Sequence, residues 1–297
     1  MGRLGDLARG GETVTAARLV RDRPLIAELQ AALVRAGLLD PPGDGFLGPA
    51  TQWALAAFCR LAGTPFEGGL SPATAAALLA PEALLPVRPG PDLAGRVAAA
   101  LLRRGDWLCR HPDCVNIVYV EGMDPEGRPT PRRPDFFDDL RLLLRIGPDG
   151  RPVIPGAWEA TTAPGRPAVE GPAEPEGAPR LSRGQHRAWV IGRTAIGTEL
   201  EQEALVQAVP VTVTRDADRN FRRAGDPPET DLYVLDQHGA LDASRKQVGG
   251  TGAGCLVGRA QDGHAAFMAA LRSDPRWGAN TAHLFTTSVI GAEELSG

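Results

Sequence analysis

The chain of 297 residues contains a single lysine, Lys246, among its 32 basic residues. A Ser–Lys dyad and a phosphate-binding P-loop each need a lysine, so neither can be built except around Lys246. Basic residues are also outnumbered, because 36 acidic residues give a net charge of -4. A protein that wraps a phosphate backbone needs a basic excess, so we expect no nucleic-acid partner.

Long apolar runs are missing as well. No run approaches the roughly 20 residues that cross a bilayer, so we expect no membrane span. Residues 1–6 lack the charged-then-apolar pattern of a secretory signal, which predicts a protein made inside the cell. The chain has four cysteines at uneven spacing, which predicts free thiols with at most one local pair: Cys59, Cys109, Cys114 and Cys255.

The first organised block covers residues 25–85. Hydrophobic residues make up 43% of the chain, enough for one large or two modest cores. Within this block, apolar residues recur at helical spacing from Leu25, Pro49 suits the first turn of a second helix, and Ser71 suits the N-cap of a third. We therefore expect three short helices, preceded by an extension over residues 1–24.

A proline-rich stretch over residues 81–91 indicates a stiff connector, and we place the linker at residues 86–91. Residues 92–297 form the second domain, which starts with a helix capped by Asp92. Its β-type runs are 115–120, 140–146, 153–161, 204–214, 232–235 and 283–290. Residues 163–180 are too rich in proline and glycine for regular structure and suit a lid or rim, and Asp262 caps a last helix.

The sequence thus predicts an α+β chain of two domains. A small three-helix bundle is followed by a mostly β domain with peripheral helices. Few apolar residues in the connector could join the two, so we expect them to fold separately.

The helical block resembles the peptidoglycan-binding-domain family of three-helix modules. The resemblance rests on separated positions: Leu29-Gln30, Leu33, Gly37, residues 44–51, Ala54-Leu55, Phe58, residues 68–70, Thr74 and Leu78-Leu79. We expect Phe46 to plug between helices and Thr51 to start the second one. Trp53 and Phe58 are interpreted as core residues rather than ligand platforms. The resemblance implies peptidoglycan, its glycan and stem peptides, as the partner.

The clearest chemical motif lies between residues 235 and 259. A predicted strand ends at His238-Gly239, and Cys255 follows 17 positions after His238, behind a glycine-rich turn. A cysteine is a nucleophile as its thiolate, which a nearby histidine and the amides of a glycine loop stabilise. The pattern therefore favours a Cys–His site over a merely packed cysteine.

This motif resembles the L,D-transpeptidase (YkuD-like) catalytic domain. The resemblance implies that Cys255 is the nucleophile and His238 the general base, with Gly239 orienting the ring and Gly254 contributing to the oxyanion hole. On the substrate side it points to Thr162, Gly165, Thr251 and Arg259. The chain departs from the family pattern at residues 252–253, at Val257, where the family has an arginine, and at Ala240. These departures leave hydrolysis open beside transpeptidation.

Two other functions stay open. His238 and Asp242, with His264 or His283, could form the site of a zinc-dependent wall peptidase, because imidazoles and a carboxylate suit zinc. The chain could also be a non-catalytic peptidoglycan-binding protein with a degenerate enzyme domain. The leading interpretation needs no metal and no cofactor.

Three further groups are interpreted as structural. Cys109 and Cys114 suggest a solvent-side loop with two thiols or a local disulfide. Arg132, Arg133 and Arg141 stand among aspartates and suggest a solvated ion-pair face, with a binding rim for acidic stem peptides as the alternative. His186 begins a strand and is a weaker site candidate.

The leading function is therefore a cell-wall enzyme that performs acyl transfer or hydrolysis on stem peptides. Its site of action would be the cell wall or periplasm. The missing signal fits a protein that is cytoplasmic until released, such as a phage-type lysin, or one exported by another route.

Overall fold

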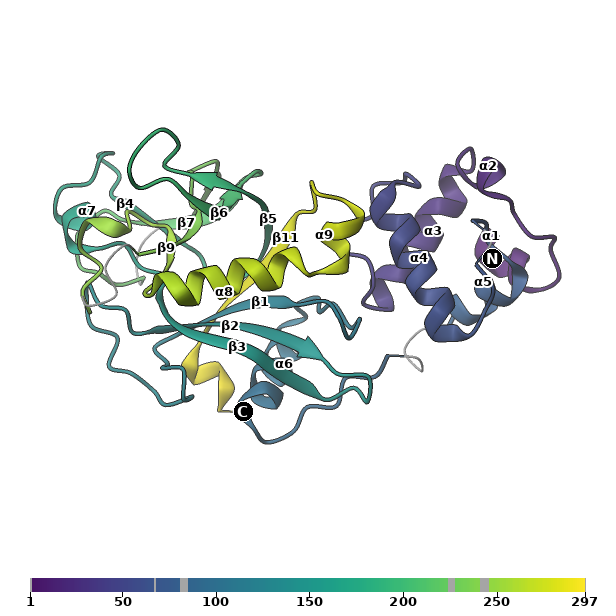
Figure 1. Ribbon diagram of the computed structural model, residues 1–297, viewed down its shortest axis with the longest axis horizontal. Coiled ribbons are helices and arrows are strands. Elements are labelled where there is room, and N and C mark those ends of the chain that lie inside the picture. The colour runs from purple at the N-terminus through teal and green to yellow at the C-terminus, as the bar shows by residue number, and fades with distance from the viewer. Residues whose placement is uncertain (1, 67, 81–84, 224–227, 241–245, 297) are drawn as a thin grey trace.

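The computed structural model spans residues 1–297 and describes all of them except residues 1, 67, 81–84, 224–227, 241–245 and 297. A helical domain lies at one end of the molecule and a β-barrel domain with peripheral helices at the other (Figure 1). Each domain has hydrophobic clusters of its own. The predicted α+β class with two such domains is confirmed.

The helical domain contains the three predicted helices and two short ones before them. Their bounds are α1 (Arg3–Ala8), α2 (Ala16–Leu19), α3 (Arg23–Arg35), α4 (Pro49–Ala62) and α5 (Pro72–Leu78). The side chain of Asp22 caps α3 by accepting from the Leu25 amide at 3.1 Å, and Ser71 caps α5 by accepting from Thr74. Phe58 is fully buried among leucines of these helices.

The segment before residue 25, expected as an extension, packs on this core. Leu4, Leu7 and Leu19 are buried in it, and the Leu4 amide donates to Glu28 at 2.8 Å. Burial of three leucines stabilises the segment by several kcal/mol in total, at roughly 2 kcal/mol each. Residues 3–19 thus add apolar contacts to a domain that would otherwise be small.

The expectation for Phe46 is wrong. Its ring is 53% exposed and lies under the Arg23 guanidinium, 4.5 Å from the ring centroid. Gln30 fills the interior place instead, and donates to Thr51 at 2.9 Å and to the Phe46 carbonyl at 3.0 Å. The Asp44 side chain accepts from the Phe46 amide, and this turn directs the ring outward.

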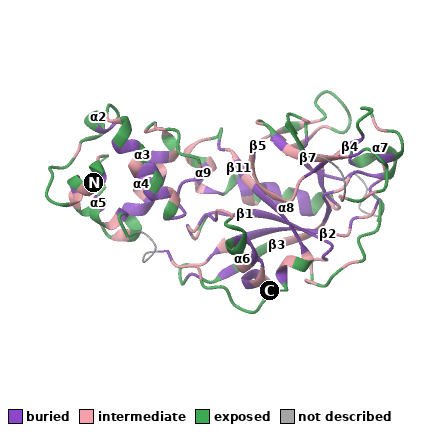
Figure 2. Ribbon diagram, turned by 180° about the vertical axis from the view of Figure 1, so that it is seen from behind, coloured by how far each residue is buried: buried purple, intermediate pink, exposed green. Residues whose placement is uncertain are grey.

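The second domain is built on a closed barrel with strand order β1-β11-β5-β6-β9-β10-β3-β2. The pairs β1–β11 and β9–β10 are parallel, whereas the other described neighbours are antiparallel. The strands are β1 (Asn116–Glu121), β2 (Asp139–Ile146), β3 (Pro152–Thr161), β5 (Gly184–Thr194), β6 (Gln202–Gln207), β9 (Gln237–Gly239), β10 (Leu256–Gly258) and β11 (Phe285–Gly291). Strands β1 and β2 are buried along almost their whole length, as Figure 2 shows.

A smaller sheet, of order β4-β7-β8, stands beside the barrel: β4 (Ala178–Leu181), β7 (Val211–Asp216) and β8 (Pro228–Asp231). Helix α6 (Leu93–Arg104) packs against β3, and α8 (Gln261–Arg272) against β9 and β10. The remaining short helices are α7 (Arg166–Glu170), α9 (Pro275–Ala279) and the 3-10 turns η2 (Gly249–Thr251) and η3 (Ala292–Leu295).

Four predicted elements need correction. The run 204–214 is two strands, because the chain turns around Pro210 and β7 leaves the barrel for the smaller sheet. Residues 232–235 form no strand, because Val234 has a φ of 58°. The segment 163–180 contains regular structure, α7 and the start of β4. Helix α8 begins at Gln261 without a side-chain cap, and Asp262 lies in its first turn.

Buried polar contacts join the two domains. Arg276, in α9, donates to Asp40 at 3.2 Å, and both side chains are buried. The Trp107 indole donates to the Val34 carbonyl at 2.9 Å, and Trp53, which is half-buried, stacks on His111. Whether the connector is cut as expected stays a prediction, because part of it, residues 81–84, lies outside the described residues.

None of the helices in the described part of the chain is both long and apolar enough to cross a membrane.

Candidate active site

Strands β9 and β10 bring the predicted histidine and cysteine to one face of the barrel wall. The parallel pairing sets His238 opposite Val257, and Cys255 immediately precedes β10. Residues two apart on a strand share a face, so Cys255 and Val257 belong to the face that carries His238. Cys255 and Val257 pack in one apolar cluster with Ala240, two residues after His238.

The ring of His238 is held in one tautomer. Its Nδ1 lies 3.1 Å from the carbonyl oxygen of Gly239. A carbonyl only accepts, so Nδ1 carries the proton and Nε2 presents a lone pair. Burial lowers the pKa of His238, which keeps the ring neutral. No described residue hydrogen-bonds Nε2, so this nitrogen is available as a base.

The thiol of Cys255 is protonated at rest. Burial, with the Asp236 carboxylate nearby, raises the pKa of Cys255 to about 11. Its Sγ lies 3.6 Å from the carbonyl oxygen of Val234 and donates toward it. The expectation of a thiolate stabilised near neutral pH is therefore corrected: the thiol of Cys255 is neutral at rest, and so is the imidazole of His238.

The glycine loop before Cys255 presents backbone donors. The amides of Gly254 and Cys255 have no acceptor among the described residues. Gly254 has a φ of 127°, and a Cβ there would lie 2.4 Å from the Pro179 carbonyl oxygen. Only glycine fits this place, and among the described residues the two amides keep their donors free. Such a pair can stabilise an oxyanion.

Gly165 contacts this loop, and Thr251 is part of it. The Gly165 amide donates to the Gly252 carbonyl at 2.8 Å, and a Cβ on Gly165 would lie 1.9 Å from Gly249 O. Thr251 is exposed at the end of η2. Gly165 therefore fixes the loop by close approach, and Thr251 is open to a ligand beside it.

The other two predicted substrate residues lie elsewhere. Thr162 is fully buried and its hydroxyl contacts the Glu121 and Asp139 carboxylates, at 2.9 and 2.8 Å. Arg259 forms an ion pair with Glu159. Thr162 thus positions buried acids, and the guanidinium of Arg259 is engaged by β3 rather than aimed at Cys255.

The set of ligands for zinc is not assembled in the described part of the chain. Both nitrogens of His264 are engaged, with Arg141 at 3.3 Å and the Glu203 carbonyl at 2.8 Å. His283 packs edge-on against Phe285, away from His264. Asp242 lies outside the described residues.

The remaining candidates are also placed. Cys109 and Cys114 are buried free thiols, not a solvent-side loop or a disulfide. Arg141 is fully buried over the Phe267 ring, so the solvated face does not include it. Nε2 of His186 donates to the Ser182 carbonyl oxygen at 2.9 Å.

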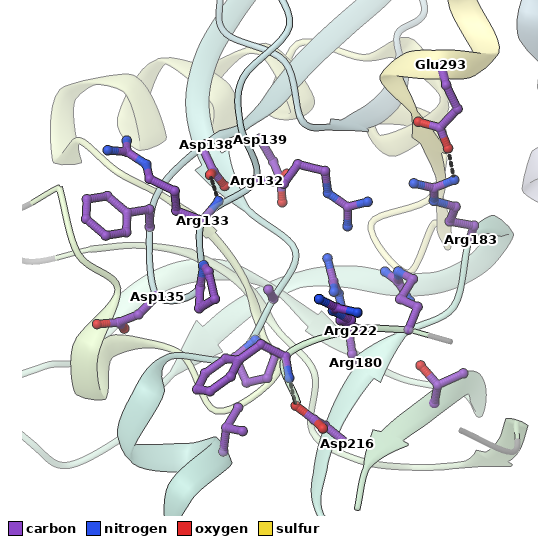
Figure 3. A pocket seen from close by; sticks show the side chains of 18 residues that line it. Arg132, Arg133, Asp135, Asp138, Asp139, Arg180, Arg183, Asp216, Arg222 and Glu293 are labelled. Carbon is purple, nitrogen blue, oxygen red and sulfur yellow. Dashed lines mark hydrogen bonds and ion pairs between the residues drawn. The ribbon is translucent and has the colours of Figure 1, made fainter. Parts of the chain in front are cut away.

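The sequence reasoning missed a cavity of about 480 Å³ beside the glycine loop. Figure 3 shows arginine side chains pointing toward one another across it. They belong to separate segments: Arg132, Arg133, Arg180, Arg183, Arg222 and Arg223. Arg132 and Arg133 were noticed in the sequence, with a binding rim as their second interpretation.

Beneath the cavity lies Glu121, a fully buried carboxylate at the end of β1. Four guanidinium groups contact it, those of Arg132, Arg180, Arg183 and Arg223. Burial alone would raise the pKa of Glu121, but Coulombic attraction by Arg180 and Arg223 holds it well below its usual range. In the sequence, a lone glutamate at the end of an apolar strand could have indicated this buried carboxylate.

Residues 22–78 match the family described as "Putative peptidoglycan binding domain". The predicted resemblance of the helical domain is therefore confirmed. No curated protein matches the chain.

Two solved structures match over most of their length. An L,D-transpeptidase from Xylanimonas cellulosilytica is 18% identical, with 90% of this chain and 93% of that chain covered and a TM-score of 0.23. A fused Zn-dependent amidase/peptidase/peptidoglycan-binding domain-containing protein from Clostridium acetobutylicum is 12% identical, with 94% and 96% covered and a TM-score of 0.27. TM-scores this low support no conclusion about the function of this chain.

Proposed function

We propose that the chain is a cell-wall enzyme that binds peptidoglycan through its helical domain and acts on stem peptides by cysteine-dependent acyl transfer. One observation carries the catalytic part. The β9–β10 pairing supports it, because His238, whose Nε2 is unprotonated, lies opposite Val257, two residues after Cys255. The family match of residues 22–78 supports the binding part.

The chemistry follows from the two neutral groups. Nε2 of His238 takes the thiol proton as Sγ of Cys255 bonds to a peptide carbonyl carbon, and the Gly254 and Cys255 amides stabilise the oxyanion. The C–N bond then breaks, and the leaving amine takes the proton from His238. An amine or water then attacks the carbonyl carbon of the resulting thioester, and the attacking group gives a proton to Nε2 of His238. As the C–S bond breaks, this proton returns to Sγ of Cys255.

The test measures release of the terminal amino acid from a soluble stem tetrapeptide by the full-length protein. We expect Cys255→Ser and His238→Gln to lower turnover at least about 100-fold, because each removes a partner in proton transfer or attack. Sedimentation with purified sacculi should be unchanged in both variants, since neither residue lies in the helical domain. Turnover that survives Cys255→Ser would overturn the proposal.

The other functions are outcomes of the same assay. Activity that is lost on chelation and survives Cys255→Ser would identify a zinc peptidase. Retained sedimentation without any turnover by the wild-type protein would identify a non-catalytic wall-binding protein.

A further inference from the structure

The arginine-lined cavity gathers six guanidinium groups that have few carboxylate partners in ion pairs. Four guanidinium groups share the one carboxylate of Glu121, and among the described residues only Arg183 reaches further acids, Glu293 and Glu294. Arg222 also lines the cavity, and no described side chain pairs with its guanidinium. Figure 3 shows Arg222 and Arg132 directed into the open space.

The aspartates that line the cavity form no ion pair with these arginines in the described part of the chain. Asp216 accepts from the Asn220 and Phe221 amides, and Asp135 accepts from the Arg166 and Gly249 amides. Burial and the Glu121 carboxylate raise the pKa of Asp139, and burial raises the pKa of Asp138 to about 6. Their oxygens accept from backbone amides, so the guanidinium groups keep donors for a ligand in the cavity.

A buried donor marks the same place independently. Nη1 of Arg223 is buried and has no hydrogen-bond partner, although Nε of the same side chain donates to Glu121 at 2.9 Å. Burial and repulsion by Arg180 lower the pKa of Arg223 to about 10. Leaving a buried guanidinium nitrogen unpaired costs roughly 1–3 kcal/mol or more, which an anion in the cavity would recover.

The cavity borders the loop that carries the nucleophile. Ala163 and Pro164 line it and precede Gly165, whose amide donates to Gly252. Arg180 also lines the cavity. It directly follows Pro179, whose carbonyl oxygen would collide with a Cβ at position 254. Segments that hold the glycine loop in place therefore also form walls of the cavity.

We propose that this cavity binds a carboxylate of the peptide on which Cys255 acts, so that the enzyme selects acidic stem peptides; this inference rests on the proposed function. Planar guanidinium groups match a carboxylate with two parallel hydrogen bonds, and several arginines around one cavity suit a ligand with more than one acidic group. The cavity volume accommodates one or two amino-acid residues.

The test is calorimetric titration of full-length Cys255→Ser protein, which cannot turn over, with a stem tetrapeptide bearing free carboxylates. A second titrant is the same peptide with its carboxylates amidated. We expect the acidic peptide to bind at least about tenfold more tightly, with an affinity that falls as salt rises. Arg132→Gln and Arg222→Gln, both at the open side of the cavity, should each remove most of that preference.

Arg151→Gln is the matched control, because Arg151 is exposed, pairs with Asp149 and lies outside the cavity. Equal affinity for both peptides, or a preference unchanged by Arg132→Gln and Arg222→Gln, would overturn the inference. Preferential binding without any turnover by the wild-type protein would instead overturn the proposed function and leave the cavity assignment standing.

Discussion

At Cys255, the sequence motif predicts a stabilised thiolate, whereas burial keeps the thiol protonated. The motif predicts which thiol and which imidazole meet, because strand pairing follows from the apolar runs around them. The pKa depends on burial, and burial of Cys255 is produced by Val257 and by distant residues such as Phe137. A resting thiol with a pKa of about 11 reacts as a nucleophile only when His238 removes its proton.

Alkylation by iodoacetamide tests this state. A thiol whose pKa is raised to about 11 is mostly protonated at pH 7, so the labelling rate of Cys255 should rise about tenfold per pH unit from pH 7 to pH 9. Mass spectrometry of tryptic peptides measures the rate, and Cys59, which is buried, serves as the internal reference. A rate that levels off below pH 8 would indicate a thiolate already present.

Gly254 offers a second test at this scale. Gly254→Ala should destabilise the protein by about 2–4 kcal/mol or displace the loop, because its φ is 127° and the Cβ would collide with Pro179 O. The measurement is urea unfolding together with turnover. Gly250→Ala is the matched control, since nothing lies within 4 Å of a Cβ there. Equal effects of the two substitutions would contradict the account of the loop.

The cluster on Glu121 shows what residue-level reasoning cannot reach. Its arginines lie 11 to 102 positions from Glu121 along the chain. No local pattern joins residues this far apart, because barrel closure and the smaller sheet bring them together. The sequence therefore predicts a candidate nucleophile, whose motif is local, and misses the arginine-lined cavity.

At the scale of elements, helices were predicted better than strands. Caps are local signals, so Ser71 and Asp92 mark helix starts correctly. The strand expected at residues 232–235 fails because Val234 adopts a positive φ, which no apolar run reveals. The same kinked segment supplies the carbonyl that faces Cys255, so the local rule fails beside the candidate site.

The cap of α6 can be tested directly. The Asp92 side chain accepts from the Gly95 amide at 2.8 Å, so Asp92→Ala should lower the free energy of unfolding by about 1 kcal/mol. Asp92→Asn keeps the acceptor and should restore most of the loss. Urea unfolding of the full-length chain measures both. A loss that Asn does not restore would show that the effect does not come from the cap.

At the scale of the whole molecule, a buried network ties the two domains. Arg276 contacts Asp274 at 2.7 Å within the barrel domain and Asp40 at 3.2 Å in the helical domain. The sequence places these residues in separate blocks, so the contact could not be predicted from patterns. Because breaking a buried pair costs several kcal/mol, this network opposes independent movement of the helical domain and the barrel domain.

This network predicts a stability loss in acid. Burial would raise the pKa of Asp274, but Arg276 lowers it from 3.8 to about 2. A lowered folded-state pKa means that this stability is present above about pH 4 and is lost as pH falls toward 2, on the order of 2 kcal/mol in all. Asp274→Asn should remove this pH dependence in urea titrations between pH 5 and pH 2. An unchanged pH dependence would show that Asp274 is not the group.

The central claim is that Cys255 is the nucleophile of a stem-peptide acyl transfer. The most direct measurement is mass spectrometry of the protein trapped during turnover. The full-length chain is mixed with a soluble stem tetrapeptide, quenched in acid and digested for peptide mapping. The account predicts a mass increase equal to the acyl portion of the peptide, located on Cys255 and absent from Cys255→Ser. Turnover with no adduct on Cys255, or an adduct on another residue, would contradict it.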